Sequence, residues 1–342
     1  MTDRPIRLAV VGATGSVGRA VLEDLEARTV PVALRLFATA SSEVDLLEFR
    51  GDELEVEKLD EKAFRGCDAA IFATPAPLAR EWAPRAWADG CLAVDLTGAF
   101  RSAPEVPLVV AGWNDGAVPE GKARGVVAGP SGPVVPLALT LGPLHRKAGV
   151  ERVVVTVLYA ASGAGRAGVR QLEKEMVALL NGEEPDASEI SHRMGFNLVP
   201  QVGAFDAGGH TEDEVAVGSE LRRLLSAPTL AAATTAIRVP VFYGHGLAVN
   251  VRTSRPLDAG EARALLRASP GVKVVDAPGE RVYPMPMLAV NDDAVLVGRI
   301  REDGSQRNGL DLFLVADNLR CGAASNAVRI AQEWVRFQRG SS

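Results

Sequence analysis

The sequence predicts an α/β fold in which a doubly wound parallel sheet is followed by a second α+β domain with a mixed sheet. Two observations predict it. The apolar run at residues 6–11 meets the glycine-rich segment GATGSVG and then the stretch VLEDLEA, which gives the strand, turn and helix order that opens a doubly wound sheet. After Ala128 the chain changes to β-branched and alternating runs, which favour a second sheet.

Short apolar runs extend the first sheet. We expect its further buried strands at residues 33–38, 69–73, 92–96 and 108–110. A helical stretch at residues 78–88 separates two of these runs, and strands that alternate with helices are typical of a parallel arrangement.

The second part of the chain predicts helices at both ends and strands between them. Helices are expected at residues 136–148 and along a stripe formed by Val169, Leu172, Met176 and Leu180. The expected strands lie at residues 152–158, 237–241, 246–253, 287–290 and 310–315, whereas residues 227–236 are merely rich in alanine. A closing helix returns to the first domain, so the predicted domains are 1–130 completed by 318–340, and 131–317.

Length, hydrophobicity and net charge limit the kinds of protein that this chain can be. The 342 residues are enough for two domains of about 100–200 residues each. No apolar run approaches the roughly 18 residues of a membrane span, and no export signal is visible, so we expect a cytoplasmic protein with no membrane partner. The net charge is -6 without a basic cluster, which excludes the usual electrostatic footprint of nucleic-acid binding. Neither the scattered histidines nor the three cysteines have metal-ligand spacing.

The glycine loop is the first candidate site. Gly12, Gly15 and Gly18 follow a predicted strand and precede a predicted helix, and this context lets backbone N–H groups and the helix N-terminus approach a phosphate. The loop therefore predicts a Rossmann-type nucleotide site, with a plain turn as the alternative.

Several motifs, taken in order and spacing, carry a resemblance to one family. They are GATGSVG, FRSAPEVPLVVAGWN, AGPSG, PLHRKAGVERVVVTVLYAASGAG, FNLVPQVG, GHTEDEV, RVPVFYGHG and DNLRCGAASNAV. In this set the chain resembles the aspartate-β-semialdehyde dehydrogenases over nearly its whole length. The resemblance implies a homodimer, and an enzyme that uses NADP, phosphate and a cysteine thiolate to interconvert a semialdehyde and an acyl phosphate through a thioacyl intermediate.

The resemblance also implies the residues of the cofactor and substrate sites. The cofactor-binding positions are Gly12, Thr14, Gly15, Ser16, Val17, Ser41 and Asn318. Those expected at the substrate are Arg101, Arg238, Glu214 and Tyr159, with Arg238 pairing with a carboxylate and Arg101 associated with phosphate or substrate. His245 matches the acid/base histidine. For each charged residue, a plain surface or strand-end role is the alternative.

The nucleophile position is Gly132. The family's A-N-P-N-C loop corresponds here to AGPSG, residues 128–132, so glycine stands where the thiolate would be. Ser131 is the nearest hydroxyl, but it is one position away and its side chain is expected to point elsewhere. Cys67 and Cys91 flank predicted strands and are interpreted as buried structural thiols, while Cys321 opens the last helix.

Other positions depart from the family pattern as well. Tyr159 replaces a glutamine, and Ala216 replaces a lysine. Pro75 and Ala76 replace paired glycines near the cofactor, and Leu96 replaces an asparagine; proline removes a backbone donor and a Cβ hinders close approach. Where basic groups would meet an adenosine 2'-phosphate, the chain has Glu43 and Asp45. Carboxylates there would favour NAD over NADP, unless they are simply solvated turn charges.

Three hypotheses follow. The first is a catalytically degenerate member, similar to the Usg-type paralogues that lack the cysteine, retained as a binding or partner protein. The second is an active NAD(P)-dependent oxidoreductase that reduces or oxidises aspartate semialdehyde or a related small carbonyl compound by a thiol-independent route assisted by His245. The third is a chain that pairs with an active relative and tunes it.

Overall fold

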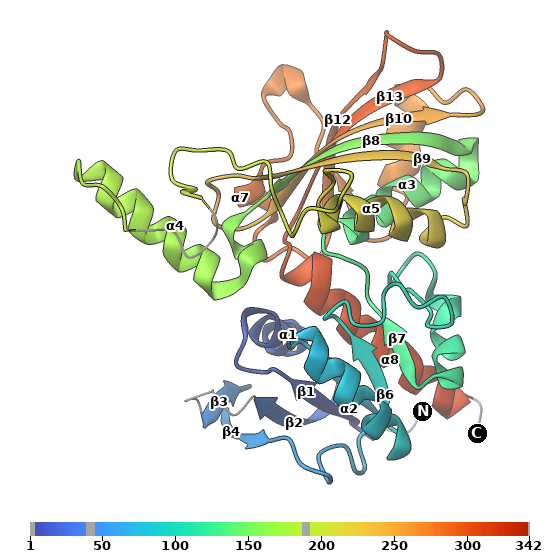
Figure 1. The fold of residues 1–342 in the computed structure, drawn as a ribbon. Helices are drawn as coiled ribbons and strands as arrows, with labels where there is room; N and C mark the ends of the chain where they lie inside the picture. Colours follow the sequence, from blue (N-terminus) through green and yellow to red (C-terminus); the bar gives the residue numbers. More distant parts are fainter. Residues whose placement is uncertain (1–3, 39–44, 187–191, 341–342) are drawn as a thin grey trace. The chain divides into compact units, whose positions relative to one another are not determined.

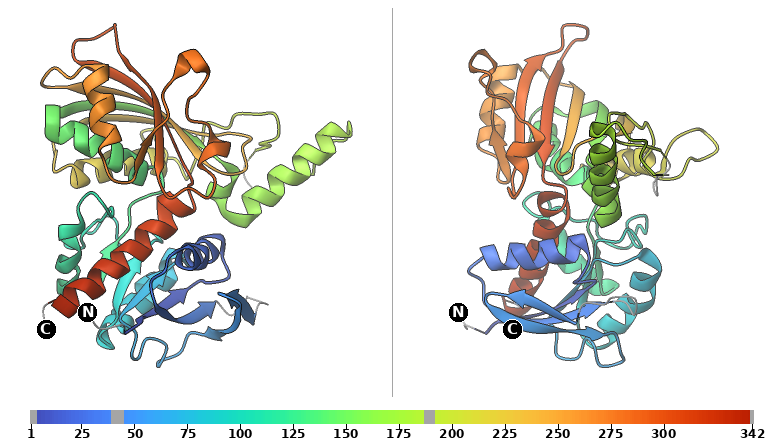
Figure 2. Two further views of the ribbon diagram at one scale, coloured as in Figure 1. Left: turned by 180° about the vertical axis from the view of Figure 1, so that it is seen from behind. Right: turned by 90° about the vertical axis from the view of Figure 1, so that its left-hand side faces the viewer.

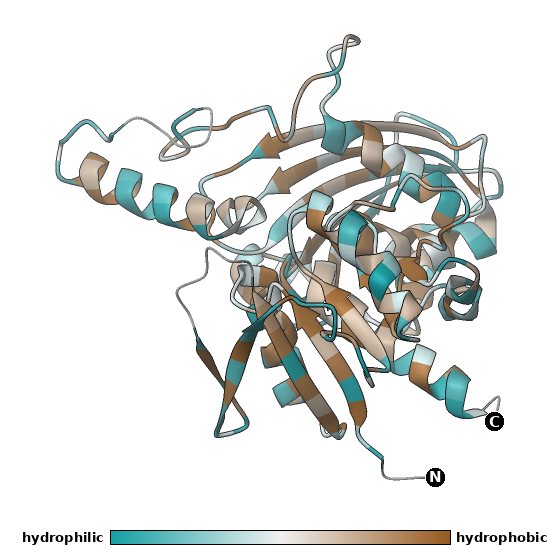
Figure 3. Cartoon of the chain, turned by 60° about the horizontal axis from the view of Figure 1, so that its bottom comes forward, coloured by the Kyte–Doolittle hydropathy of each residue, from teal (hydrophilic) through white to brown (hydrophobic). Residues whose placement is uncertain are grey.

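The computed structural model describes residues 4–38, 45–186 and 192–340. The chain forms two compact units, Met1–Pro130 with Ala323–Ser342, and Ser131–Gly322 (Figure 1). Both are mixtures of helices and strands, and the predicted fold class is confirmed. Hydrophobic residues are concentrated on the strands of both sheets, and hydrophilic residues on outer helical turns (Figure 3). Among the described helices, none is long and apolar enough to cross a bilayer.

The first unit is built on a seven-stranded sheet. Its strands are β1 (Ile6–Val11), β2 (Val32–Ala38), β3 (Leu46–Phe49), β4 (Asp52–Lys58), β5 (Ala69–Phe72), β6 (Leu92–Asp95) and β7 (Val126–Ala128). Their spatial order across the sheet is β3-β4-β2-β1-β5-β6-β7. All pairs are parallel except the edge hairpin of β3 and β4. β1 pairs with β2 on one side and β5 on the other, so the order of winding reverses beside β1. In doubly wound sheets this reversal marks the ligand crevice.

Helices cover both faces of this sheet. They are α1 (Ser16–Ala27), α2 (Ala76–Ala88) and the closing α8 (Ser325–Gly340), with a 3-10 segment at Asp115–Ala123. α8 contacts α1, β5 and β6, and α2 lies on the opposite face (Figure 2). The core includes a chain of aromatic rings, Phe37, Phe64, Phe72 and Trp82, all nearly excluded from solvent. Burial of such large side chains is the main stabilising contribution here.

The second unit is built on a six-stranded sheet in the order β11-β12-β13-β10-β8-β9. The strands are β8 (Val150–Tyr159), β9 (Ala231–Arg238), β10 (His245–Thr253), β11 (Val272–Val274), β12 (Val295–Glu302) and β13 (Gly309–Ala316). The two outer pairs, β11 with β12 and β8 with β9, are parallel, and the three inner pairs are antiparallel, as predicted for a mixed sheet.

One face of this second sheet is covered by helices. They are α3 (Val134–Ala148), α5 (Glu212–Leu224) and α6 (Ala259–Arg267), each in contact with at least one strand of the sheet. Along β8, Val153, Val155 and Val157 are buried while the residues between them are only half-buried, which is the alternation of a sheet with one covered face. α4 (Gly165–Leu180) extends outward from the sheet (Figure 1), and α7 (Pro286–Ala289) is a single turn.

Three predicted strands need correction. Residues 108–110 form only an isolated bridge, Leu108 to Ala128, because the segment meets β7 at one point. Residues 287–290 fall on α7, where Pro286 at the start sets a helical φ. The strand expected at 237–241 is β9, which lies earlier: the alanine-rich stretch from Ala231 pairs in parallel with β8. Alanine has low strand propensity, and the partner strand overrides it.

Candidate functional site

The glycine loop lies at the carboxyl end of β1, beside the reversal of strand order. Gly12 has φ +91°, and a Cβ there would lie 2.3 Å from the carbonyl oxygen of Ala73, which follows β5. A Cβ on Gly18 would lie 2.2 Å from the carbonyl oxygen of Gly12. Both glycines are therefore required for close packing of loop, strand and helix. A Cβ on Gly15, by contrast, would meet its nearest atom, the carbonyl oxygen of Gly12, at 3.4 Å, which is an ordinary van der Waals contact.

The start of α1 provides donors for an anion. Gly15 is the N-cap and offers no side-chain cap, so the amides of the first turn, beginning at Ser16 and Val17, are not capped by it. The side chain of Arg19 donates to the carbonyl oxygen of Thr14 and braces the loop at 3.3 Å. A tightly packed glycine loop before a helix N-terminus without a side-chain cap fits the diphosphate of a dinucleotide.

The structure describes only some of the other positions that were expected near the cofactor. Ser41 and Glu43 lie outside the described residues. Asp45 is exposed just before β3. Pro75 is the N-cap of α2 and Ala76 its first residue, so the substituted pair serves to begin a helix.

Arg101 lies near the carboxyl ends of β6 and β7. Its Nε donates to the carbonyl oxygen of Gly129, and Nη2 donates to that of Leu96, both at 2.9 Å. The buried carboxylate of Asp95 accepts hydrogen bonds from the backbone of Thr97 and Phe100 and so shapes the intervening turn. In this structure the guanidinium joins two strand ends, and its predicted contact with phosphate or substrate stays a prediction.

Gly132 stands in open space near the start of α3. A Cβ built on it would have no heavy atom within 4 Å. Ser131, its neighbour, is buried and points to α5: its backbone N–H and its Oγ both donate to one carboxylate oxygen of Glu220, at 2.7 and 3.0 Å. The hydroxyl therefore anchors the loop to α5. The side chain of Ser131 was expected to point away from the position of residue 132, but its partner Glu220 was not predicted.

His245 is buried at the start of β10. Its Nδ1 accepts the backbone N–H of Ala160 at 3.2 Å, which leaves Nε2 as the protonated nitrogen of the neutral ring. Its ring centroid lies 4.8 Å from that of Tyr159. Burial, and secondly the charge of Arg238, lower the pKa of His245 to about 3, so the imidazole is neutral at physiological pH.

The depressed pKa of His245 predicts acid sensitivity. Between pH 6.5 and about 3 the unfolded chain binds a proton at this residue and the folded chain does not, so stability is lost as pH falls through that window. The expected slope approaches about 1.4 kcal/mol per pH unit from this group alone. Urea unfolding of His245→Asn at pH 7 and pH 5 should show a smaller loss than the unmodified chain. His210→Phe, at an exposed histidine, is the control, and an undiminished loss in His245→Asn would contradict the assignment.

Arg238 ends β9 and carries an unsatisfied donor. The residue is 7% exposed, and within the described ranges its Nη1 is buried without a hydrogen-bond partner. Burial lowers the pKa of the guanidinium, while the nearby negative charge of Asp213 opposes that shift. Since a buried guanidinium donor is costly to leave unpaired, its geometry suits an incoming anion.

Asp213, rather than Glu214, faces this group of side chains. The Tyr159 hydroxyl donates to Oδ1 of Asp213 at 3.2 Å, and burial followed by the charge of Asp213 raises the pKa of the phenol. Both carboxylate oxygens of Glu214 accept backbone N–H groups, from Thr211 and Ala236. Thr211 and Glu214 form a capping box at the start of α5, and the T-x-x-E spacing in the sequence was the signal that could have assigned Glu214 to it.

Asn318 joins two loops of the second unit. Its Oδ1 accepts hydrogen bonds from Ser162 Oγ at 2.9 Å and from the Gly244 amide at 3.2 Å. Gly244 immediately precedes His245, so this amide fixes the approach to β10. Its predicted contact with a cofactor stays a prediction.

All three cysteines are buried. Burial raises the pKa of the Cys67 and Cys91 thiols, which disfavours the thiolate and fits the structural role expected for them. Cys321 precedes Gly322, whose backbone packs against Gly132. The described residues contain no group of three or more histidine, cysteine or acidic side chains arranged to hold a metal ion.

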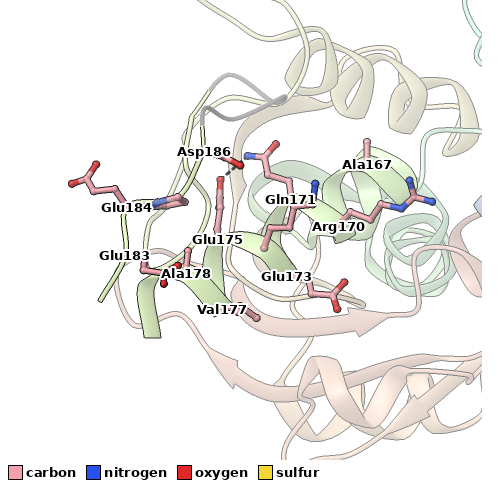
Figure 4. A pocket seen from close by; sticks show the side chains of 12 residues that line it. Ala167, Arg170, Gln171, Glu173, Glu175, Val177, Ala178, Glu183, Glu184 and Asp186 are labelled. Carbon is pink, nitrogen blue, oxygen red and sulfur yellow. Dashed lines mark hydrogen bonds between the residues drawn. The ribbon is translucent and has the colours of Figure 1, made fainter. Parts of the chain in front are cut away.

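A separate pocket lies along α4. It is lined by Arg170, Lys174 and Glu175 together with the returning segment of Glu183, Glu184 and Asp186, and its volume is about 830 Å³ (Figure 4). Gln171 donates to Glu175 inside it at 2.8 Å. None of the sequence-predicted site residues lines this pocket.

Both parts of the chain match models of known protein families. Residues 7–120 match the family model described as semialdehyde dehydrogenase, NAD binding domain, and residues 141–321 match the model described as semialdehyde dehydrogenase, dimerisation domain. Aspartate-semialdehyde dehydrogenase from Aquifex aeolicus is 40% identical over 96% of this chain and 98% of the relative, and that from Synechocystis is 37% identical over 96% and 97%. The crystal structure of aspartate semialdehyde dehydrogenase II from Vibrio cholerae, complexed with ASA, superposes with a TM-score of 0.93 at 35% identity, covering 97% and 99%.

Proposed function

Since the chain belongs to the aspartate-semialdehyde dehydrogenase family, we propose that it retains a nicotinamide site and a carboxylate pocket but does not carry out the thiol-dependent reaction. The observation that carries this proposal is Gly132, which leaves open space at the nucleophile position. Acyl transfer to phosphate needs a group that attacks a carbonyl and then leaves, and glycine has no such group. The nearest hydroxyl, on Ser131, is held by Glu220.

The pKa values and the charge around Arg238 support a role in binding a ligand rather than in catalysing a reaction. A base with a pKa of about 3 is far from the operating pH at which general acid–base catalysis is effective, and this is the state of His245. The phenol of Tyr159 has a raised pKa, which makes it a weaker proton donor than a free tyrosine. Arg238 keeps an unpaired buried donor, which a ligand carboxylate would satisfy.

The glycine loop supports retention of a dinucleotide. The residues that would hold its phosphates are Gly12, Gly15 and the first amides of α1, and a nicotinamide ring would supply hydride transfer. Asp45, which precedes β3, and Glu43 favour NAD over NADP, since carboxylates repel a 2'-phosphate.

Nucleotide binding predicts a rise in melting temperature. At a hundredfold excess over Kd, a ligand specific for the folded state adds about 2.7 kcal/mol of stability. Thermal unfolding with NAD, NADH, NADP and NADPH should show such a rise, larger for NAD forms. Gly15→Asp is the control: aspartate is a good N-cap, so the free protein should stay as stable, but its carboxylate would repel the phosphates. Unchanged melting with all four nucleotides at millimolar concentration would contradict the nicotinamide site.

A second function is favoured by the unpaired donor of Arg238. The chain would be an oxidoreductase that passes a hydride from NADH or NADPH directly to the carbonyl carbon of a small compound whose carboxylate is bound by Arg238. His245 would donate a hydrogen bond to the carbonyl oxygen, the resulting alkoxide would take a proton from water, and no covalent intermediate would form. Oxidation of NADH or NADPH in the presence of aspartate semialdehyde, without phosphate, tests this function. Failure to detect an alcohol product would remove it.

We also propose a homodimer formed through the second unit, supported by the match to a dimerisation domain over residues 141–321. Pairing with an active relative is the alternative assembly. Co-expression of the two chains followed by affinity purification of one would separate these assemblies.

A further inference from the structure

We propose that a second copy of this chain docks on the apolar side chains around α7, and that this contact holds the turn that leads to His245. The inference rests on the homodimer proposed above and names the surface that forms it. This surface, called the α7 patch, consists of exposed side chains only: Phe242, Tyr243, Met285, Met287, Leu288 and Val290.

The α7 patch is built from two segments that meet in the fold. A Cβ on Gly244 would lie 2.9 Å from the carbonyl oxygen of Pro286 and 3.2 Å from its Cα, so the turn before β10 rests against the start of α7. Met287 is 88% exposed and Leu288 is 52% exposed. Single exposed apolar side chains are normal on a protein surface, but a group of large ones is typical of a site of contact with another molecule.

The patch continues onto the face of the second sheet opposite α3, α5 and α6. α7 lies at one end of this sheet and contacts β13 (Figure 1). Ala289 packs there with Leu296 and Val315, and Phe313 lies against the same cluster. The strand register places the exposed Ala248 directly opposite Phe313, on the same face. Specific interfaces bury roughly 800 Å² on each partner, which one helical turn cannot supply but a turn joined to a sheet face can.

The charges that follow the α7 patch in the chain favour a second copy as the occupant. Asp292 pairs with Lys273 at 2.6 Å, and Asp293 pairs with Arg320 at 2.9 Å. In a two-fold interface the same surface lies on both sides, so unpaired like charges would meet and repel, whereas charges paired within each chain would not. The family model for a dimerisation domain, matched over residues 141–321, includes every residue of the patch.

The inner side of the same turn is bonded to the candidate site. The carbonyl oxygen of Phe242 accepts the Ser162 amide at 3.0 Å, and the Gly244 amide donates to Oδ1 of Asn318 at 3.2 Å. His245 is the next residue. A partner that covers the Phe242 side chain restricts the motion of this turn, so docking on the patch and the position of His245 are linked.

Sedimentation equilibrium of the full chain tests the surface. The unmodified chain should be a dimer, and Met287→Glu should raise its dissociation constant at least about a hundredfold, because a two-fold interface receives the new charge twice. Met287 is exposed in the single chain, so the monomer should stay folded, which thermal unfolding checks. Val177→Glu, at a 56% exposed apolar residue of α4, is the matched control and should leave the constant unchanged.

Hydrogen exchange resolved to single amides tests the link to His245. The Gly244 amide is bonded to Asn318, so its exchange reports loosening of the turn and not the uncovering of a surface. In Met287→Glu this amide should exchange at least about tenfold faster than in the unmodified dimer. The amides of residues 249–251, within β10, should exchange at an unchanged rate.

The failures are distinguishable. A monomeric unmodified chain would contradict the homodimer itself. A dimer that persists in Met287→Glu, or that dissociates in Val177→Glu, would show that the two copies meet on another surface and would overturn the α7 patch. Dissociation of Met287→Glu with unchanged exchange at Gly244 would overturn the link to His245. The nicotinamide site proposed above is independent of all these outcomes.

Discussion

Gly132→Cys is expected to yield a folded protein with a reactive thiol and a phosphate-dependent activity well above that of the unmodified chain. The new Cβ would meet no heavy atom within 4 Å, so the substitution requires no repacking. A thiolate there would restore both the attacking and the leaving group of the family reaction. Iodoacetamide labelling, mapped by mass spectrometry, would check access to the thiol.

The expected gain in turnover is about 10²-fold or more over background, below the roughly 10⁶-fold that a nucleophile contributes in an intact site. The deficit reflects Tyr159 and Ala216, which remain unlike the family pattern. Gly132→Ala, which fills the same space without a thiol, is the matched control. A labelled but wholly inactive Gly132→Cys would show that the surrounding pocket is lost as well.

Gly18→Ala is expected to destabilise the first unit severely although the residue lies in a helix. In an exposed helix interior this change would stabilise by about 1 kcal/mol through helix propensity. Here the Cβ would approach the Gly12 carbonyl oxygen to 2.2 Å and the Ala13 backbone to 2.7 Å, and these are backbone atoms that cannot move aside separately. A loss of more than about 3 kcal/mol in urea unfolding is expected, in the range of severe overpacking.

Gly15→Ala provides the internal comparison, because it lies in the same loop with its nearest contact at 3.4 Å. Its free energy of unfolding should change by less than about 1 kcal/mol, the size of an ordinary N-cap effect. Equal stability of Gly18→Ala and Gly15→Ala would mean that the glycines do not pack the loop as described.

The sequence predicted the fold where hydrophobic period and turn chemistry agree. GATGSVG between an apolar run and VLEDLEA places β1 and α1 correctly, since strand, glycine turn and helix are encoded locally. β9 was misplaced because its alanines carry no strand signal, and its pairing with β8 is a long-range effect. β12 and α5 were not predicted, and in α5 the capping box at Thr211 was the overlooked signal.

The candidate site was predictable only in part. His245, Arg238 and Tyr159 could be chosen from motifs, and the structure gathers them with Asp213. The T-x-x-E spacing could have assigned Glu214 to the cap of α5, but the hydrogen bond from Tyr159 to Asp213 joins residues on separate elements and has no local signature. The bond from Ser131 to Glu220 joins residues on separate elements and has no local signature.

The central claim is tested most directly by assaying the unmodified chain for phosphate-dependent reduction of NAD or NADP with aspartate semialdehyde, beside Gly132→Ala and Gly132→Cys. We expect the unmodified chain to match Gly132→Ala at background and Gly132→Cys alone to exceed it. Phosphate-dependent turnover by the unmodified chain, retained in Gly132→Ala, would contradict the account, because it would require a nucleophile other than residue 132.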